Sequence, residues 1–97
     1  MTPQESIRKE ILKLPGAVEK PNRWGTKHSY FVGEKEFAHF HPKSQMDILK
    51  TPKADMKDKR IEKNPYSEKW ILFNFRTEQD AKDAIELVRM AYLSISK

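Results

Sequence analysis

The sequence contains no cysteine, which excludes a disulfide scaffold, a thiol nucleophile and a thiolate metal site. Its three glycines form no phosphate-binding loop, and its serines include no G-x-S-x-G nucleophile elbow. No apolar run approaches the ~18 residues needed to span a bilayer, and the N-terminus has no apolar signal core. These absences predict a cytoplasmic protein with no membrane contact, and they leave no motif that specifies a reaction.

The composition favours one folded domain over residues 1–97. Apolar residues make up 37% of the chain and charged residues 34%. The apolar positions are clustered and periodic, which distinguishes the chain from a disordered one. Two Trp, five Phe and three Tyr supply bulky side chains for a small core.

Positive charge is unevenly distributed along this basic protein. The formal net charge is +5, and residues 1–27 carry six basic and three acidic side chains. Residues 43–69 carry eight basic and five acidic side chains, whereas residues 77–97 carry three basic and four acidic ones. Such asymmetry attracts nucleic acid or another polyanion, but interspersed charges are also typical of an ordinary solvated surface.

Both ends of the chain carry helix signals. Thr-Pro-Gln-Glu at residues 2–5 is typical of a capped helix start, and Pro15-Gly16 marks the end of that helix. Residues 77–80 repeat the capping pattern, and apolar residues follow at helical spacing over residues 81–95. We therefore expect an N-terminal helix and a long C-terminal helix.

Four segments predict strands. Residues 29–32 and 36–41 are rich in β-forming residues and are separated by a short Gly-containing turn, which indicates a hairpin. Residues 46–50 and 70–75 are the other two. The last one is apolar on both faces, which is typical of a strand covered on both sides, so we expect Trp70 to pack in the core.

Thr51-Pro52 resembles the N-terminal cap and predicts a short central helix over about residues 53–61. The expected fold class is therefore α+β. A mainly antiparallel sheet of about four to five strands is packed by the N-terminal and the long C-terminal helix, with the short central helix in addition.

Several segments resemble a known family when they are taken together and in order. They are the stretch Gly33-Glu34-Lys35-Glu36-Phe37-Ala38-His39-Phe40-His41, then Met46-Asp47-Ile48, Trp70-Ile71-Leu72-Phe73, Thr77-Glu78-Gln79-Asp80 and residues 87–92. The chain resembles the small proteins of the "luciferase domain" family over about residues 17–95, a label that implies no light emission. More loosely, it is similar to the YjbR-like double-wing proteins, for which DNA binding is suggested by fold analogy. Neither resemblance implies a catalytic residue set.

A histidine pair is the most chemically suggestive feature. His39 and His41 lie two apart in a predicted strand and should project from the same face. Asp47 in the neighbouring strand is a candidate third ligand for a metal, and His28 precedes the partner strand of the hairpin. The alternative is structural, with one histidine hydrogen-bonded within the sheet and the other exposed, because H-x-H alone is a weak motif.

A second candidate site is a set of basic residues that could bind a polyanion. At helical spacing Lys53, Lys57 and Arg60 would share a face, although acidic residues are threaded through the same segment. Trp24 is flanked by cations and could stack on a base, although burial is the simpler role for it. The full candidate set is Lys50, Lys53, Lys57, Arg60, Lys63, Arg23 and Trp24.

Three functions remain open. The sequence favours a non-enzymatic binding or accessory module that contacts a protein or an anionic ligand. The alternatives are a nucleic-acid-binding domain that uses the Lys-rich central segment, and a small His-dependent or metal-dependent enzyme. The sequence specifies no cofactor and no particular partner.

Overall fold

A computed structural model describes residues 2–23, 25–52 and 54–96. The expectations for Trp24 and Lys53 therefore lie outside the described residues. The elements in chain order are α1 (Pro3–Ile11), β1 (Ala17–Lys20), β2 (Ser29–Val32), β3 (Lys35–His41), β4 (Gln45–Leu49), β5 (Ile61–Lys63), β6 (Trp70–Asn74) and α2 (Glu78–Ile95).

The six strands found in these ranges form one sheet in the order β1-β2-β3-β4-β6-β5. Every neighbouring pair is antiparallel. The α+β class, the two terminal helices and the antiparallel sheet are as expected, and the strand count is slightly higher. The additional strands are β1 and β5, which lie at the two edges and are only four and three residues long.

Both helices begin where the capping signals in the sequence predict, whereas α1 ends at Ile11 and not at Pro15-Gly16 as expected. The Thr2 side chain accepts a hydrogen bond from the backbone N–H of Glu5, and the Glu5 side chain accepts one from Thr2. Thr77 and Asp80 make the same reciprocal pair at the start of α2. Each box satisfies amide groups that have no partner inside the helix, and so fixes where the helix begins.

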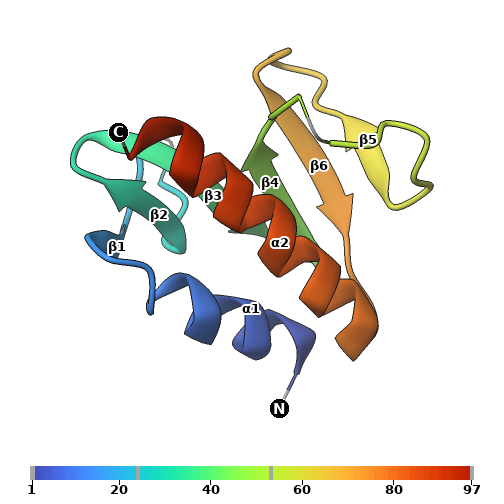
Figure 1. Ribbon diagram of the computed structural model, residues 1–97, viewed down its shortest axis with the longest axis horizontal. Helices are drawn as coiled ribbons and strands as arrows, with labels where there is room; N and C mark the ends of the chain where they lie inside the picture. Colours follow the sequence, from blue (N-terminus) through green and yellow to red (C-terminus); the bar gives the residue numbers. More distant parts are fainter. Residues whose placement is uncertain (1, 24, 53, 97) are drawn as a thin grey trace.

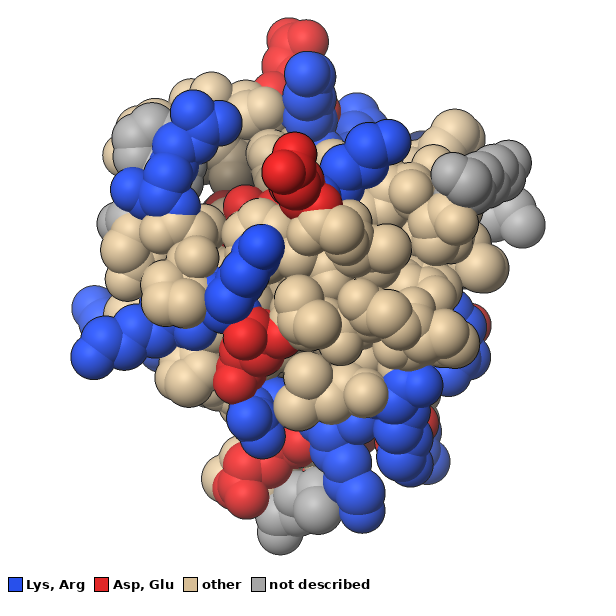
Figure 2. Space-filling model, turned by 90° about the vertical axis from the view of Figure 1, so that its left-hand side faces the viewer, with Lys and Arg blue, Asp and Glu red and all other residues tan. Residues whose placement is uncertain are grey.

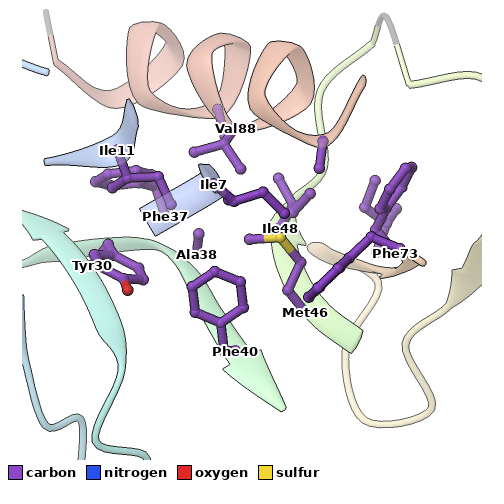
Figure 3. Close-up of a cluster of buried hydrophobic side chains, with 14 of the residues drawn as sticks. Ile7, Ile11, Tyr30, Phe37, Ala38, Phe40, Met46, Ile48, Phe73 and Val88 are labelled. Atoms are coloured by element: carbon purple, nitrogen blue, oxygen red, sulfur yellow. The ribbon is translucent and has the colours of Figure 1, made fainter. Parts of the chain in front are cut away.

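Both helices lie on the same side of the sheet (Figure 1). α2 packs against β3 and β4, and α1 packs beside α2. The buried side chains fill the layer between them, where Ile7 of α1 and Val88 of α2 meet Phe37, Ile48 and other residues of the strands (Figure 3). Within the described residues, no helix has the length and apolar character needed to cross a membrane.

Strand β6 alternates as the sequence predicts. Ile71 and Phe73 are buried against the helix layer, whereas Trp70 and Leu72 are only partly buried. The expectation that Trp70 packs in the core is therefore wrong. Both helices lie on one side of the sheet, and the Trp70 indole lies beside His39 in the lining of a hollow on the other side.

The expected short central helix is also absent among the described residues of the segment, which instead form turns that lead into β5. Two aspartates explain the difference. The Asp55 side chain accepts a hydrogen bond from the backbone N–H of Lys57, and Asp58 accepts one from the N–H of Arg60. Such bonds two residues along the chain satisfy amides that a helix would need, and they favour turns.

Candidate functional site

The sheet face opposite the helices contains a hollow of about 610 Å³. Its lining combines carboxylates, imidazoles, amides, hydroxyls and an indole: Asn22, Thr26, Glu36, His39, His41, Asp47, Asn64, Tyr66, Ser67 and Trp70. A second hollow of about 380 Å³ shares His41, Asp47, Asn64 and Tyr66 with the first. The two therefore form one concave region, which we call the open-face hollow.

Strand register brings the predicted histidine pair to Asp47. His39 of β3 lies opposite Asp47 of β4, and His41 lies opposite Gln45. Directly opposed residues in an antiparallel pair share a face. The grouping of His39, His41 and Asp47 that the sequence suggested is therefore present, on the open face.

Both imidazoles contact the same carboxylate oxygen. Nε2 of His39 lies 2.8 Å from Oδ2 of Asp47, and Nε2 of His41 lies 2.9 Å from that atom. The two rings meet edge to face with centroids 5.0 Å apart. The Trp70 indole also packs against the His39 ring, with centroids 5.4 Å apart.

Glu36 is a further site residue, which sequence reasoning missed. Oε2 of Glu36 lies 3.1 Å from Nδ1 of His39, and it also accepts a hydrogen bond from Nδ2 of Asn22 at 3.1 Å. Strict strand alternation would place Glu36 and His39 on opposite faces, because they are three residues apart. A bulge in β3 removes that conflict, since Tyr30 pairs with Ala38 and the next residue pairs with Glu36, which leaves Phe37 without a pairing partner.

The electrostatics of the cluster favour a protonated His39 beside ionised carboxylates. Burial disfavours the charged form of His39, but the hydrogen bonds and charges of Asp47 and Glu36 outweigh it and raise the pKa of His39 to about 9. Burial likewise acts to raise the pKa of Asp47, yet the hydrogen bonds from His39 and His41 hold it below its usual value. A carboxylate–imidazolium–carboxylate row therefore lies at the base of the open-face hollow at neutral pH.

One atom of this cluster has no partner. Oδ1 of Asp47 is buried and accepts no hydrogen bond from the described residues. Asp47 as a whole is only 5% exposed. Burying an unpaired carboxylate oxygen is costly. The arrangement is therefore incomplete as a purely structural hydrogen-bond network.

His28 does not join the pair. Its Nδ1 lies 3.4 Å from Oε2 of Glu19, which also accepts hydrogen bonds from Arg8 at 2.9 Å and from the Tyr30 hydroxyl at 2.6 Å. His28 thus belongs to a separate polar cluster around Glu19. His28 directly precedes β2 in the sequence, but this position does not bring its side chain to the open-face hollow.

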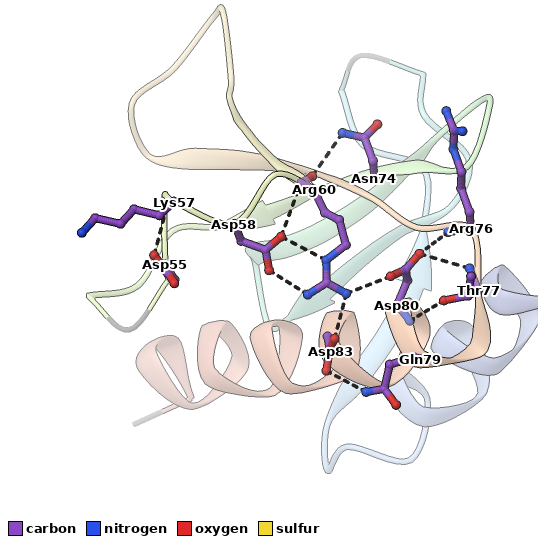
Figure 4. A network of polar contacts seen from close by, with 10 residues as sticks. All are labelled: Asp55, Lys57, Asp58, Arg60, Asn74, Arg76, Thr77, Gln79, Asp80 and Asp83. Carbon is purple, nitrogen blue, oxygen red and sulfur yellow. Dashed lines mark hydrogen bonds and ion pairs between the residues drawn. The ribbon is translucent and has the colours of Figure 1, made fainter.

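Among the described candidate basic residues, Arg60 differs from the others in its contacts. Arg60 forms ion pairs with Asp58, Asp80 and Asp83, so it joins the β5 side of the sheet to α2 (Figure 4). The other described candidates are exposed: Arg23, Lys50, Lys57 and Lys63. On the face drawn in Figure 2, Lys and Arg side chains are spread out with Asp and Glu among them.

Searches against curated proteins and against solved structures give no significant match. The family model described as "Luciferase domain" matches residues 34–91, from the hairpin turn to the last third of α2. Glu36, His39, His41, Asp47 and Trp70 all lie inside the matched segment. The chain belongs to the Luciferase domain family.

Proposed function

We propose that the protein is a binding module that holds a small polar molecule in the open-face hollow. The observation that carries this proposal is the convergence of His39, His41 and Asp47 at the base of a concavity of about 610 Å³. Small-molecule sites typically have volumes of about 300–1,000 Å³ and combine apolar walls with a few convergent polar groups. His39, His41 and Asp47 are held in place by the pairing of β3 with β4, which preorganises them.

The lining chemistry indicates the charge of the ligand. Glu36 and Asp47 contribute two carboxylates to the larger hollow, whose described lining contains no Lys or Arg, and Lys43 lines only the smaller one. His39 compensates only one of those negative charges at neutral pH. Trp70 offers a flat apolar wall beside them. We therefore expect a neutral or cationic molecule with a ring, rather than the anionic ligand that the basic composition suggests.

Two probes with the same ring and opposite charge test this proposal. Benzylamine and benzoate are titrated separately into the ¹⁵N-labelled protein, and amide shifts are followed by NMR. Saturable shifts at residues 36–47 and at Trp70 are expected with benzylamine but not with benzoate. The variant Trp70→Ala should weaken the benzylamine shifts, whereas Leu93→Ala, which removes an exposed side chain from α2, should not. Equal responses to both probes, or none to either, would argue against the proposal.

Nucleic-acid binding stays a prediction with less support. The central helix that would align Lys53, Lys57 and Arg60 is absent from the described residues, and Arg60 is engaged by three aspartates. Retention on a mixed-sequence duplex that weakens steeply with salt would favour this alternative. The enzyme alternative also stays a prediction.

A further inference from the structure

We propose that His39, His41 and Asp47 bind one divalent transition-metal ion at the base of the open-face hollow. This inference rests on the proposed function, because it names the ion beside which the small molecule would bind. The three residues come from two paired strands, so their positions are set by sheet register rather than by a loop.

The donor geometry fits such an ion. One ligand atom from each of the three residues lies within 4.8 Å of the other two. A tetrahedral zinc ion with bonds of about 2.0–2.1 Å would hold its ligand atoms about 3.3 Å apart. The distances of 2.8 and 2.9 Å from the two Nε2 atoms to Asp47 thus need to open by only about half an ångström.

The donor types also narrow the class of metal. Two neutral imidazoles and one carboxylate suit Zn²⁺, Fe²⁺, Co²⁺ or Ni²⁺ better than Mg²⁺ or Ca²⁺, which prefer oxygen ligands alone. Three protein ligands leave at least one coordination position for water or for a bound molecule. The open-face hollow lies beside the ligands and provides room for that group.

The surrounding contacts resemble those around the ligands of metal sites. Nδ1 of His39 faces Glu36, and Glu36 is itself oriented by Asn22. A ligating histidine usually donates its other ring N–H to a carboxylate, which fixes the ring and its tautomer. Glu36 is therefore a positioning residue for His39, and the β3 bulge is what brings it there.

The unpartnered Oδ1 of Asp47 is the second, independent observation. In a self-sufficient hydrogen-bond network, the two imidazoles would share the two carboxylate oxygens between them. Here both Nε2 atoms contact Oδ2, and Oδ1 is buried with no partner among the described residues. A cation among these three groups would displace the proton between His39 and Asp47 and stabilise the full charge of the carboxylate.

Metal titration of the full chain, stripped beforehand with EDTA, tests the inference. Isothermal calorimetry with Zn²⁺ should give one site per chain. Titration with Co²⁺ should produce visible d–d absorption bands that saturate at one Co²⁺ per chain. Asp47→Asn and His41→Ala should lower the Zn²⁺ affinity by at least about 100-fold, because each removes a ligand. His41 is 39% exposed, so its replacement should leave the fold intact, as circular dichroism can verify.

The third histidine provides the matched control. His28→Ala removes an imidazole that is 55% exposed and lies outside the cluster, and it should leave Zn²⁺ affinity unchanged. Glu36→Gln should lower affinity about 10–100-fold while the stoichiometry stays at one, as expected for a positioning residue. No saturable Zn²⁺ binding, or equal effects of His28→Ala and His41→Ala, would overturn the inference.

The benzylamine titration repeated in EDTA separates the two proposals. If the protein shows benzylamine shifts in EDTA and no saturable Zn²⁺ binding in the calorimetry, the small-molecule proposal stands and the metal site alone is overturned. Stoichiometric Zn²⁺ binding without any benzylamine response would support the metal site and argue against the proposed ligand class.

Discussion

Oε2 of Glu36 lies 3.1 Å from Nδ1 of His39 on the same face of β3, although the two residues are three positions apart in the strand. The bulge at Phe37 produces this relationship, because the extra residue reverses the alternation once. The same bulge directs Phe37 into the core, where its ring packs edge to face against Tyr92 with centroids 5.8 Å apart. One irregular residue therefore serves both the core and the candidate site.

Trp70 and Phe73 should differ sharply in their contribution to stability. Phe73 of β6 is fully buried between the sheet and the helices, whereas Trp70 is partly exposed on the open face. Phe73→Ala should cost about 3–5 kcal/mol, and Trp70→Ala only about 1–2 kcal/mol, because less of its surface is removed from water. Urea denaturation of both variants measures the difference. Equal losses would place Trp70 in the core after all.

Replacement of Arg60 should destabilise the protein rather than only reduce its charge. Arg60 lies among three aspartates and also packs over the Phe73 ring at 5.2 Å. Arg60→Met would leave those carboxylates facing one another, so we expect a loss on the order of 1–2 kcal/mol. Lys57→Met, an exposed neighbour, should change the free energy of unfolding by less than about 0.5 kcal/mol. Thermal melts of the two variants compare them directly, and identical melts would contradict the structural role of Arg60.

Acid should weaken the protein partly through Glu19. The hydrogen bond from Arg8 is the largest influence, and together with Tyr30 and His28 it lowers the pKa of Glu19 from 4.5 to about 2 against the opposing effect of burial. A carboxyl with a lowered folded-state pKa stabilises the fold above its unfolded pKa, and this contribution is lost as the pH falls through the folded value. The relevant window is therefore about pH 4.5 down to 2.

Glu19→Gln isolates this contribution. The difference in free energy of unfolding between the wild type and the variant should be largest at pH 6 and should shrink as the pH approaches 2. Chemical denaturation at several pH values measures it. A difference that stays constant over this range would mean that the charge of Glu19 contributes nothing.

The turn between β3 and β4 offers a stabilising substitution. Ser44 has a φ of 61°, in the left-handed region that is unfavourable for residues with a side chain. Ser44→Gly should raise stability by about 1 kcal/mol, because glycine adopts this conformation without strain. Glu34→Gly is the control, since Glu34 lies in the other hairpin turn and has no positive φ. Equal changes in melting temperature for both would rule out relief of strain as the cause.

Much of the fold follows from local patterns. The capping residues near Thr2 and Thr77, the hairpin turn at Gly33 and the alternation of β6 each rest on neighbours in the chain, so the sequence predicts them correctly. The prediction of a central helix was wrong because the side chains of Asp55 and Asp58 accept hydrogen bonds from backbone amides two residues along the chain. This local competition outweighed the helix-start signal of Thr51-Pro52.

For the site, the sequence by itself determined that His39 and His41 share a strand face, because side chains alternate with period two. It also made Asp47 a reasonable partner in the next strand. Only the tertiary structure decided that Trp70 lines a hollow and not the core, that His28 pairs with Glu19, and that Glu36 reaches His39. Those outcomes depend on which face the helices cover and on a bulge in the strand pairing, and both are set by packing between distant segments rather than by residue order.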